Sequence, residues 1–442
     1  MRLSLSSHFN TKKLILFSLP SILMMIFISI YGVVDGFFVS NFAGDTPFAA
    51  LNFIYPVIMV LSSLGFMFGA GGSALISKTL GEKDNEKANK IFSLLVYVCI
   101  GIGVILSILT IIFIRPIAIF LGASTQMLDM CVSYARIIIA VLPFHILQFY
   151  FQSLLITAEK PKVSLIITLI SGCTNMILDA LFIAVFKWGI EGAAIATAIS
   201  IVLGGLIPIF YFARKNDSLL RLGKTSFDMK SLAKVCINGS SEFVSNISMS
   251  VVSMLYNYQL MKYLGQNGVS AYGTFMYVGM IFLAVYIGYS SAITPIVGYN
   301  YGAKNTKELQ GVFKRSLFFI LAGSVAMVIF SEFMAYPLSY LFVSYNDELL
   351  KLTTKAMYIS SISFLFTGIC IFSSNFFTAL NNGLISAFIS FVRTLIIQII
   401  AILVLPIIMG PDGIWVSLIV AEFAAALIAS IFLIIKRKKY QY

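Results

Sequence analysis

The sequence has little charge of either sign. Charged residues make up 11% of its 442 residues, with 18 Asp and Glu against 30 Lys and Arg. Soluble domains carry about 25% charged residues, and a surface with so few charges would not remain in water. The composition therefore excludes a soluble globular protein.

Residues that carry catalysis or bind metals are also scarce. The two histidines, His8 and His145, have no nucleophile or metal-ligand spacing around them, and the chain lacks a GxxxxGK[ST] phosphate loop. We therefore expect no enzyme, no metal centre and no cofactor, with any energy supplied by an ion gradient. Each cysteine stands alone in an apolar stretch, which favours packing over disulfides. The five are Cys99, Cys131, Cys173, Cys236 and Cys370.

Apolar residues, in contrast, are abundant. They form 59% of the chain, and a spanning helix needs about 20 of them in a mostly apolar run. The runs predict twelve spans, the first of which continues past Tyr31 and so differs from a cleavable signal. They cover residues 13–40, 47–77, 91–114, 129–157, 163–186, 190–213, 234–262, 269–297, 316–335, 349–380, 384–408 and 412–435. The sequence thus predicts an all-α integral membrane protein in a lipid bilayer.

Basic residues collect in the loops on one side of these spans. That side holds 23 of the 30, including Arg2, and only Arg136 and Arg393 fall inside spans. The positive-inside rule places both termini in the cytoplasm of a bacterial-type plasma membrane. The excess of Lys and Arg therefore reflects the orientation of the chain in the membrane, and we expect no nucleic-acid partner.

The chain also repeats itself when it is shifted by half its length of 442 residues. Matched pairs that punctuate spans and loops include Gly44 with Gly265, Gly81 with Gly302, Pro116 with Pro337, and Gly189 with Gly410. We expect two lobes of six helices related by a pseudo-two-fold axis along the membrane normal. The predicted divisions are an N-lobe at 1–213, a cytoplasmic linker at 214–230 and a C-lobe at 231–442, in a monomer. Two such lobes enclose a cleft that rocking opens to either side, which favours transport.

Ionisable groups inside a membrane are costly and suggest function. Asp35 lies in the first span, Asn175 and Asp179 lie one helical turn apart in the fifth, and Thr197 lies in the sixth. All four have a similar depth near the outer end. Their oxygens suit a monovalent cation, or the carboxyl groups carry protons. The alternative is structural: Asp35 bonds a helix backbone, and the fifth-span pair caps a kink.

Other polar residues are weaker candidates. Glu242 follows a polar stretch near the inner end of the seventh span and is a candidate second-lobe coupling acid. Gln148 and Gln152, spaced by four, and Asn375 in the tenth span are candidates to line the cleft. Pro20 removes a backbone hydrogen bond in the first span and is a candidate hinge.

Charged residues at mid-span have structural alternatives. Arg393 and Glu422, in neighbouring spans, are expected to pair. Arg136 either pairs with Asp129 or attracts an anionic group. His145 is expected to be a hydrogen-bonded interior residue.

These features resemble the multidrug and toxic compound extrusion (MATE) family. The resemblance rests on the two lobes, on Asp35 following Pro20, and on GGSALIS at 71–77 followed by LGEKD at 80–84. The second motif recurs as YGAKN at 301–305. The likeness extends over nearly the whole chain.

The resemblance implies export of organic cations and amphipathic drugs in exchange for Na+ or H+. It also implies that Asp35, Asn175, Asp179 and Thr197 form the N-lobe ion site. Some members have further acids in the seventh, eighth and tenth spans, whereas here the eighth has none.

Three other functions fit the sequence less well. A flippase or exporter of a lipid-linked saccharide or another metabolite, from the same superfamily, would need a more basic cavity. A major-facilitator transporter would carry a basic loop between the second and third spans, which residues 80–90 lack. A membrane transferase or receptor would need a catalytic pair or a soluble domain.

Overall fold

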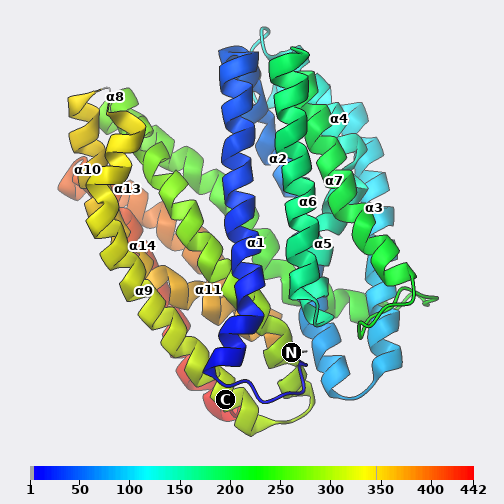
Figure 1. Cartoon of the computed structure of the whole chain (residues 1–442). Coiled ribbons are helices and arrows are strands. Elements are labelled where there is room, and N and C mark those ends of the chain that lie inside the picture. Colours follow the sequence, from blue (N-terminus) through cyan, green and yellow to red (C-terminus); the bar gives the residue numbers. More distant parts are fainter. Residues whose placement is uncertain (1–3, 345) are drawn as a thin grey trace.

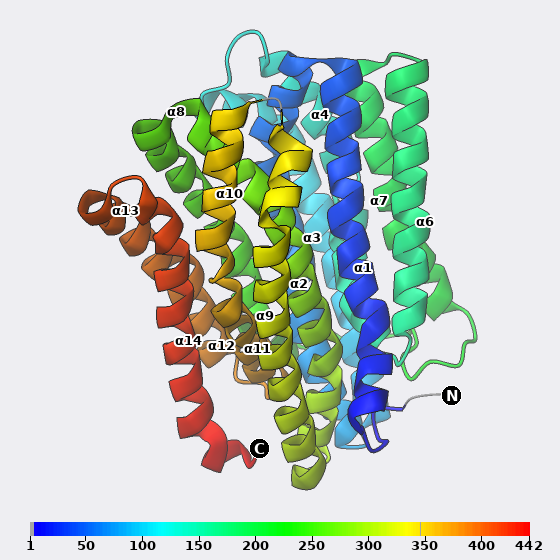
Figure 2. The ribbon, with the colours of Figure 1, turned by 60° about the vertical axis from the view of Figure 1, so that its left-hand side comes forward.

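The computed structural model describes residues 4–344 and 346–442, so Arg2 lies outside the described residues. The described part of the chain is helical and contains no strand. Figures 1 and 2 show two bundles side by side, built from the first and second halves of the chain. Both termini lie at the same end of the molecule (Figure 1), and the bundles diverge towards the other end.

The first bundle contains seven α-helices and two π-helical segments. In chain order these are α1 (Thr11–Phe38), η1 (Val39–Ala43), α2 (Asp45–Gly81), α3 (Asn85–Phe120), α4 (Leu128–Ala140), α5 (Leu142–Thr157), α6 (Pro161–Asp179), η2 (Ala180–Val185) and α7 (Gly189–Ala213). The helix α1 continues through Pro20. Each predicted span of this half therefore has a helical counterpart.

The second bundle begins with one exceptionally long helical element. The elements of the second bundle are α8 (Met229–Gly302), α9 (Thr306–Val343), α10 (Asp347–Ser361), α11 (Phe364–Ala379), α12 (Gly383–Phe391), η3 (Val392–Ile397), α13 (Gln398–Met409) and α14 (Asp412–Tyr440). Within α8, Gly265 is not helical, with φ 62° and ψ −153°. The 74 residues of α8 are therefore two spans joined at this glycine.

Two further spans are bent. The pair α4 and α5 meets at 59°, and the pair α10 and α11 meets at 48°. If each bent pair is one span and α8 is two, the described residues contain the twelve predicted spans. The all-α membrane fold is confirmed.

The same turns recur in both bundles. Backbone positions with positive φ, which a glycine adopts without strain, occur in matched pairs half a chain length apart. The pairs are Gly44 with Gly265, Lys83 with Lys304, and Gly189 with Gly410. The sequence repeat is thus visible as a repeat of backbone geometry.

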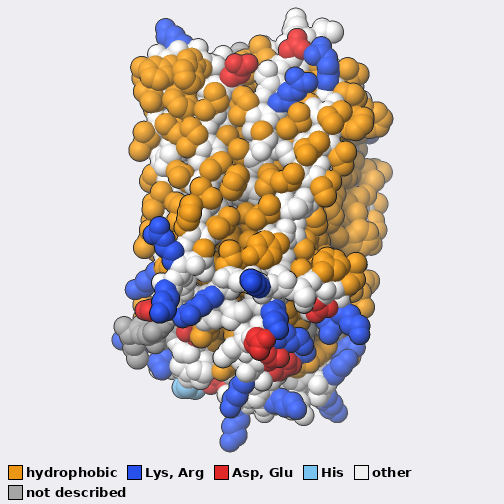
Figure 3. All heavy atoms as spheres, turned by 90° about the vertical axis from the view of Figure 1, so that its right-hand side faces the viewer, with side chains coloured by type: hydrophobic (Ala, Val, Ile, Leu, Met, Phe, Trp, Pro, Cys, Tyr) orange, Lys and Arg blue, Asp and Glu red, His pale blue; other side chains and the backbone are white. Residues whose placement is uncertain are grey.

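Charged loops gather at the end that holds both termini. We call this the basic end; it comprises the termini, the charged loops at 82–84, 158–160, 214–228 and 303–305, and the uncharged turn at 380–382. Figure 3 shows many Lys and Arg side chains clustered there, a broad band of hydrophobic side chains above them, and a few charged side chains at the opposite end. Such a belt is the surface expected of a protein immersed in lipid.

Backbone contacts join the bundles near the basic end. A methyl group added at Gly81 would lie 2.1 Å from the carbonyl oxygen of Tyr299, and one added at Gly302 would lie 2.0 Å from that of Lys78. The two contacts are equivalent, because Gly302 stands half a chain length from Gly81 and Tyr299 stands half a chain length from Lys78. Only glycine permits so close an approach, so α2 and α8 seal the bundles together here.

The segment between the bundles is fastened rather than free. It leaves α7 at Ala213 and enters α8 at Met229, and the Arg221 amide donates to Asn89 Oδ1 of α3 at 2.6 Å. Asp228 caps α8 by accepting from the amides of Lys230 and Ser231. Hydrogen bonds from Ser231 lower the pKa of the Asp228 carboxyl.

All five cysteines are free thiols. Cys99, Cys131 and Cys370 are buried, as expected for packing residues. Cys173 is exposed, so the packing prediction is wrong for this residue. It lies on the face of α6 turned away from the core, where an isolated apolar side chain faces the surroundings.

Candidate functional site

A close contact between α1 and α6 brings the first-bundle acids together. A methyl group added at Gly172 of α6 would lie 2.5 Å from the Phe27 ring and 3.0 Å from the Tyr31 ring of α1. With no side chain at Gly172, the helices approach each other about two turns before Asp179. The two acids then lie on facing helices, where their carboxyl groups interact with each other.

The carboxyl oxygens at this position lack donors. Asp35 Oδ1 and both Asp179 oxygens are buried and accept no hydrogen bond from any described residue. Asp179 is 0% exposed. Buried acceptors are nearly always satisfied, and two carboxylates this close repel each other unless a cation or a proton joins them. The arrangement therefore calls for a positive species.

Neighbouring polar groups complete the first-bundle site. Asn175 is buried, and its Nδ2 donates to Thr197 Oγ1 of α7 at 3.3 Å. Tyr134 of α4, also buried, is within hydrogen-bonding reach of Thr197. The structure thus places Asp35, Asn175, Asp179 and Thr197 together, and adds Tyr134, which sequence reasoning missed. No local motif distinguishes Tyr134 from the other tyrosines.

The backbone changes at this point. The α-helical part of α6 ends at Asp179, and η2 follows directly. Single π-helical turns are frequent at functional sites. The donors here are oxygens, and among the described residues no group of three His, Cys, Asp or Glu is arranged to hold a metal ion. This donor set suits a hard monovalent cation or a proton better than a transition metal.

A second polar region lies in the cavity between the bundles. The cavity has a volume of about 310 Å³ and is lined by both halves of the chain. Glu242, Gln152 and Asn375 all face it, whereas Asp35 and Asp179 are not among its lining residues. The candidate ion site and the central cavity are therefore separate places.

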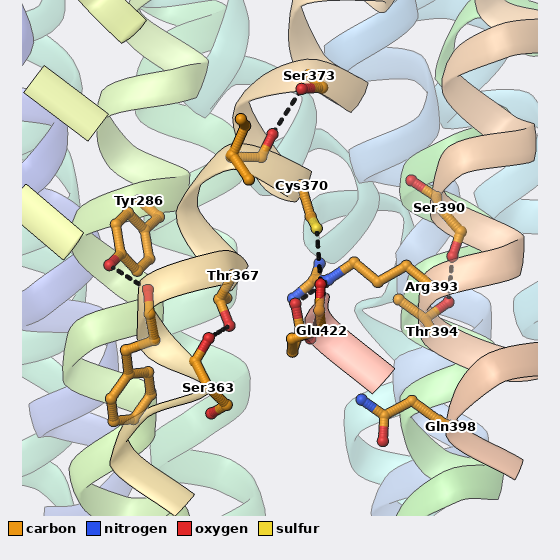
Figure 4. Close-up of polar contacts among 12 residues, drawn as sticks. Tyr286, Ser363, Thr367, Cys370, Ser373, Ser390, Arg393, Thr394, Gln398 and Glu422 are labelled. Carbon is orange, nitrogen blue, oxygen red and sulfur yellow. Dashed lines mark hydrogen bonds and ion pairs between the residues drawn. The ribbon is translucent and has the colours of Figure 1, made fainter. Parts of the chain in front are cut away.

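An ion pair stands in the wall of this cavity. Arg393 Nε lies 3.0 Å from both carboxylate oxygens of Glu422, which confirms the predicted pairing. Figure 4 shows Arg393 reaching across to Glu422, below Cys370. Among the described residues Glu242 makes no ion pair within 4.0 Å, so this cavity carries one carboxylate beyond the pair.

A comparison with protein-family models shows the family to which the chain belongs. The family model described as MatE matches residues 20–181 and, a second time, residues 243–404. The chain belongs to the MatE family. The starting points of the two matches, at positions 20 and 243, are separated by close to half the chain length, as the repeat requires.

Curated relatives and solved structures agree with this membership. The chain is 28% identical over 425 residues to the multidrug export protein MepA of Staphylococcus haemolyticus (strain JCSC1435), covering 95% of this chain and 92% of that protein. It is 27% identical to MepA of Staphylococcus aureus (strain NCTC 8325 / PS 47), covering 97% and 94%. A crystal structure of MATE in complex with MaL6 superimposes with a TM-score of 0.93 at 22% identity, covering 98% of both chains.

This MatE-family protein is therefore a multi-pass membrane transporter and not an enzyme.

Gln148 does not line its central cavity. Together with Gln152 it faces a separate, nearly water-sized cavity of about 10 Å³ inside the first bundle. Gly204 leaves room for the Gln148 amide, since an added methyl group would lie 2.7 Å from it.

Two further expectations for the transporter have clear outcomes. His145 is buried and lies 2.8 Å from Ser62 Oγ through Nδ1, as expected of a bonded interior histidine. Asp129, in contrast, pairs with Arg115 at 2.8 Å rather than with Arg136. Arg136 is exposed on α4. The partner of Asp129 therefore comes from α3 and not from α4, the helix that holds both Asp129 and Arg136.

Proposed function

We propose that the protein is a cation-coupled antiporter that exports organic cations, drugs or toxic amphipathic compounds by alternating access. Na+ or H+ is the coupling ion. The observation that carries this proposal is the pair Asp35 and Asp179, three of whose carboxyl oxygens are buried and accept no hydrogen bond from any described residue. The names of the MepA relatives support multidrug export.

Coupling follows from repulsion between the two acids. Without a bound cation or proton, two facing carboxylates at this burial are unfavourable, and they push α1 and α6 apart. Entry of the ion joins them, with Asn175 and Thr197 as further oxygen ligands. Because α1 also lines the central cavity through Met24 and Met25, its movement changes the substrate cavity. Ion entry from the end opposite the basic end then favours substrate release, and substrate binding from the basic end reverses the change. Pro20 serves as the hinge of α1.

The cavity chemistry favours positively charged substrates. Of the described residues that line it, Arg393 is the single basic one, and Glu422 already neutralises it. Glu242 is left as the second-lobe acid that faces a cation. Aromatic rings of Tyr256 and Tyr272 add surfaces that attract organic cations. A flippase for an anionic lipid-linked saccharide is disfavoured by this charge.

The basic loops support an orientation for the transporter. We propose that the basic end faces the cytoplasm of a bacterial-type plasma membrane, with both termini inside. The proposed lobes are 1–213 and 231–442, with the linker 214–230 on the cytoplasmic side. A monomer suffices, because one chain supplies both sides of the cavity.

The test is dye efflux from proteoliposomes, driven by a Na+ gradient in one set and a pH gradient in another. Removal of one carboxylate by Asp35→Asn or Asp179→Asn should weaken gradient-driven efflux about 10- to 100-fold, the range expected for lost interactions with a charged group. The matched control is Asp129→Asn. It removes an exposed carboxylate at the same end and should leave coupling intact.

Full gradient-driven efflux by Asp35→Asn at normal expression would contradict the proposal. Activity with one gradient only identifies the ion. Movement of a lipid-linked saccharide that does not depend on Asp35 would favour the flippase instead.

A further inference from the structure

The N-terminal segment at the basic end is packed against both bundles. Leu5 and Phe9 are each 0% exposed. They belong to one apolar cluster that includes Ile156 of α5 in the first bundle and Leu309 and Val312 of α9 in the second. Residues 4–10 therefore cover the seam between the halves of the chain.

One carboxylate holds this segment to the first bundle. Glu159, in the turn between α5 and α6, accepts hydrogen bonds through Oε1 from Ser4 Oγ at 2.9 Å and from the Leu5 amide at 2.6 Å. Bonds to a charged acceptor are stronger than neutral ones. The start of the segment is thus fixed to the α5–α6 turn.

A second carboxylate holds the segment to the second bundle. Glu308, in the first turn of α9, is 8% exposed. Its Oε2 lies 2.6 Å from His8 Nδ1, and its Oε1 accepts from the Phe9 amide at 2.8 Å. Arg315 of the same helix donates to the Phe9 carbonyl oxygen at 2.7 Å. The end of the segment is thus fixed to α9.

We infer that residues 4–10, held by Glu159 and Glu308, form a clasp that keeps the basic end closed and sets how readily it opens. The inference rests on the proposed alternating access, since opening there separates α5 from α9. The segment then has to release one of the two carboxylates. Glu159 and Glu308 act as positioning residues, because they touch the segment and not the substrate.

The clasp has no equivalent in the other half of the sequence repeat. The positions half a chain length from Glu159 and Glu308 are Leu380 and Lys87, and neither provides a carboxylate. The glycine contacts of α2 and α8 are present in both halves, but the clasp is present once. It therefore adjusts opening without being required by the symmetry of the fold.

Distances between spin labels test the clasp in the full chain. Cysteines replace the exposed Lys87 and Lys307, one in each bundle at the basic end, in a variant whose five native cysteines are alanine. Double electron–electron resonance then gives the ratio of wide to narrow separations. The double variant Glu159→Ala and Glu308→Ala should raise this ratio about tenfold, as expected for lost hydrogen bonds to charged groups.

Three further variants separate the clasp from general effects. Glu86→Ala removes an exposed carboxylate at the same end, whose partner Lys90 lies on the same helix at 2.6 Å, and should leave the ratio unchanged. Glu308→Gln keeps an acceptor for the Phe9 amide and should give an intermediate ratio. Ser4→Ala with His8→Ala alters only the tail, so it should fold, and it should shift the ratio in the same direction.

Ratios equal to that of Glu86→Ala, in protein that still binds dye, would overturn the clasp. A wild-type protein that never shows the wide separation would overturn both the clasp and alternating access. Loss of ion coupling alone would abolish gradient-driven efflux but leave these distances responsive to the clasp variants. The two failures are therefore distinguishable.

Discussion

Equivalent positions in the two bundles carry opposite chemistry. Asp35 in α1 and Tyr256 in α8 stand half a chain length apart. Around Asp35, carboxyl oxygens are buried, and no described residue donates a hydrogen bond to them. The Tyr256 hydroxyl is buried too, but it donates to Gln398 Oε1 at 2.9 Å and lies 2.8 Å from Ser417 Oγ. At this position the first bundle has carboxyl oxygens that a positive charge would stabilise. The second bundle has a neutral hydroxyl whose hydrogen bonds are already made.

The reverse holds for the charged pair of the second bundle. Arg393 and Glu422 face the cavity, whereas their equivalents in the first bundle are Gly172 and Ile201. Gly172 instead permits the close approach of α1 and α6. The repeated backbone therefore carries a different polar site in each half. We expect the ion to bind within the first bundle and the substrate to bind in the cavity that both halves line.

Breaking the ion pair of the second bundle should have the largest effect on folding. Arg393→Leu leaves Glu422 buried without its partner, and the free energy of unfolding should fall by about 3–5 kcal/mol. Adding Glu422→Leu should recover most of this loss, since no unpaired charge remains. The measurement is thermal unfolding in detergent. If the double variant were as unstable as Arg393→Leu alone, the pair would not be the cause.

Substitution of the reciprocal glycines should have the next largest effect. Gly81→Ala and Gly302→Ala each push a methyl group into a carbonyl oxygen and should cost about 1–3 kcal/mol. The two costs should be similar, because the contacts are equivalent. Gly101→Ala and Gly323→Ala are the controls, since no described atom outside the local helix backbone lies within 4 Å of an added methyl group there. Equal midpoints for all four variants in thermal unfolding would contradict the described seal.

Removal of the Tyr256 hydroxyl should have the smallest effect. Tyr256→Phe loses two hydrogen bonds and should lower the free energy of unfolding by about 1–2 kcal/mol. It should leave the dependence of efflux on the ion gradient unchanged, unlike Asp35→Asn. A loss of coupling, measured in the same proteoliposomes, would show that the second bundle also has an ion site at this depth.

Much of the fold could be predicted from the sequence, because its signals are local and strong. Apolar length defines the spans, and glycines at 44 and 189 mark turns that recur half a chain length later. Lone acids in apolar helices are conspicuous for the same reason. Their proximity followed from equal depth, but the roles of Asp35 and Asp179 stay predictions.

Other features depend on contacts between distant helices and leave no local pattern. Asp129 pairs with Arg115 of α3, although Arg136 is nearer in sequence and lies on the same helix as Asp129. Gln148 and Gln152 share a helix face, yet only Gln152 reaches the central cavity. Glu159 and Glu308 look like ordinary loop charges until the fold places the N-terminal segment between them.

The reciprocal contact of Gly81 and Gly302 has one more consequence. A patch that fits its own repeat is self-complementary, as in an isologous two-fold dimer. Two copies of a single half, each presenting Gly81 and the Lys78 carbonyl, would bring the same surfaces together. This chain therefore has, where its halves meet near the basic end, the contact geometry of a symmetric homodimer, even though its two halves differ in their polar chemistry.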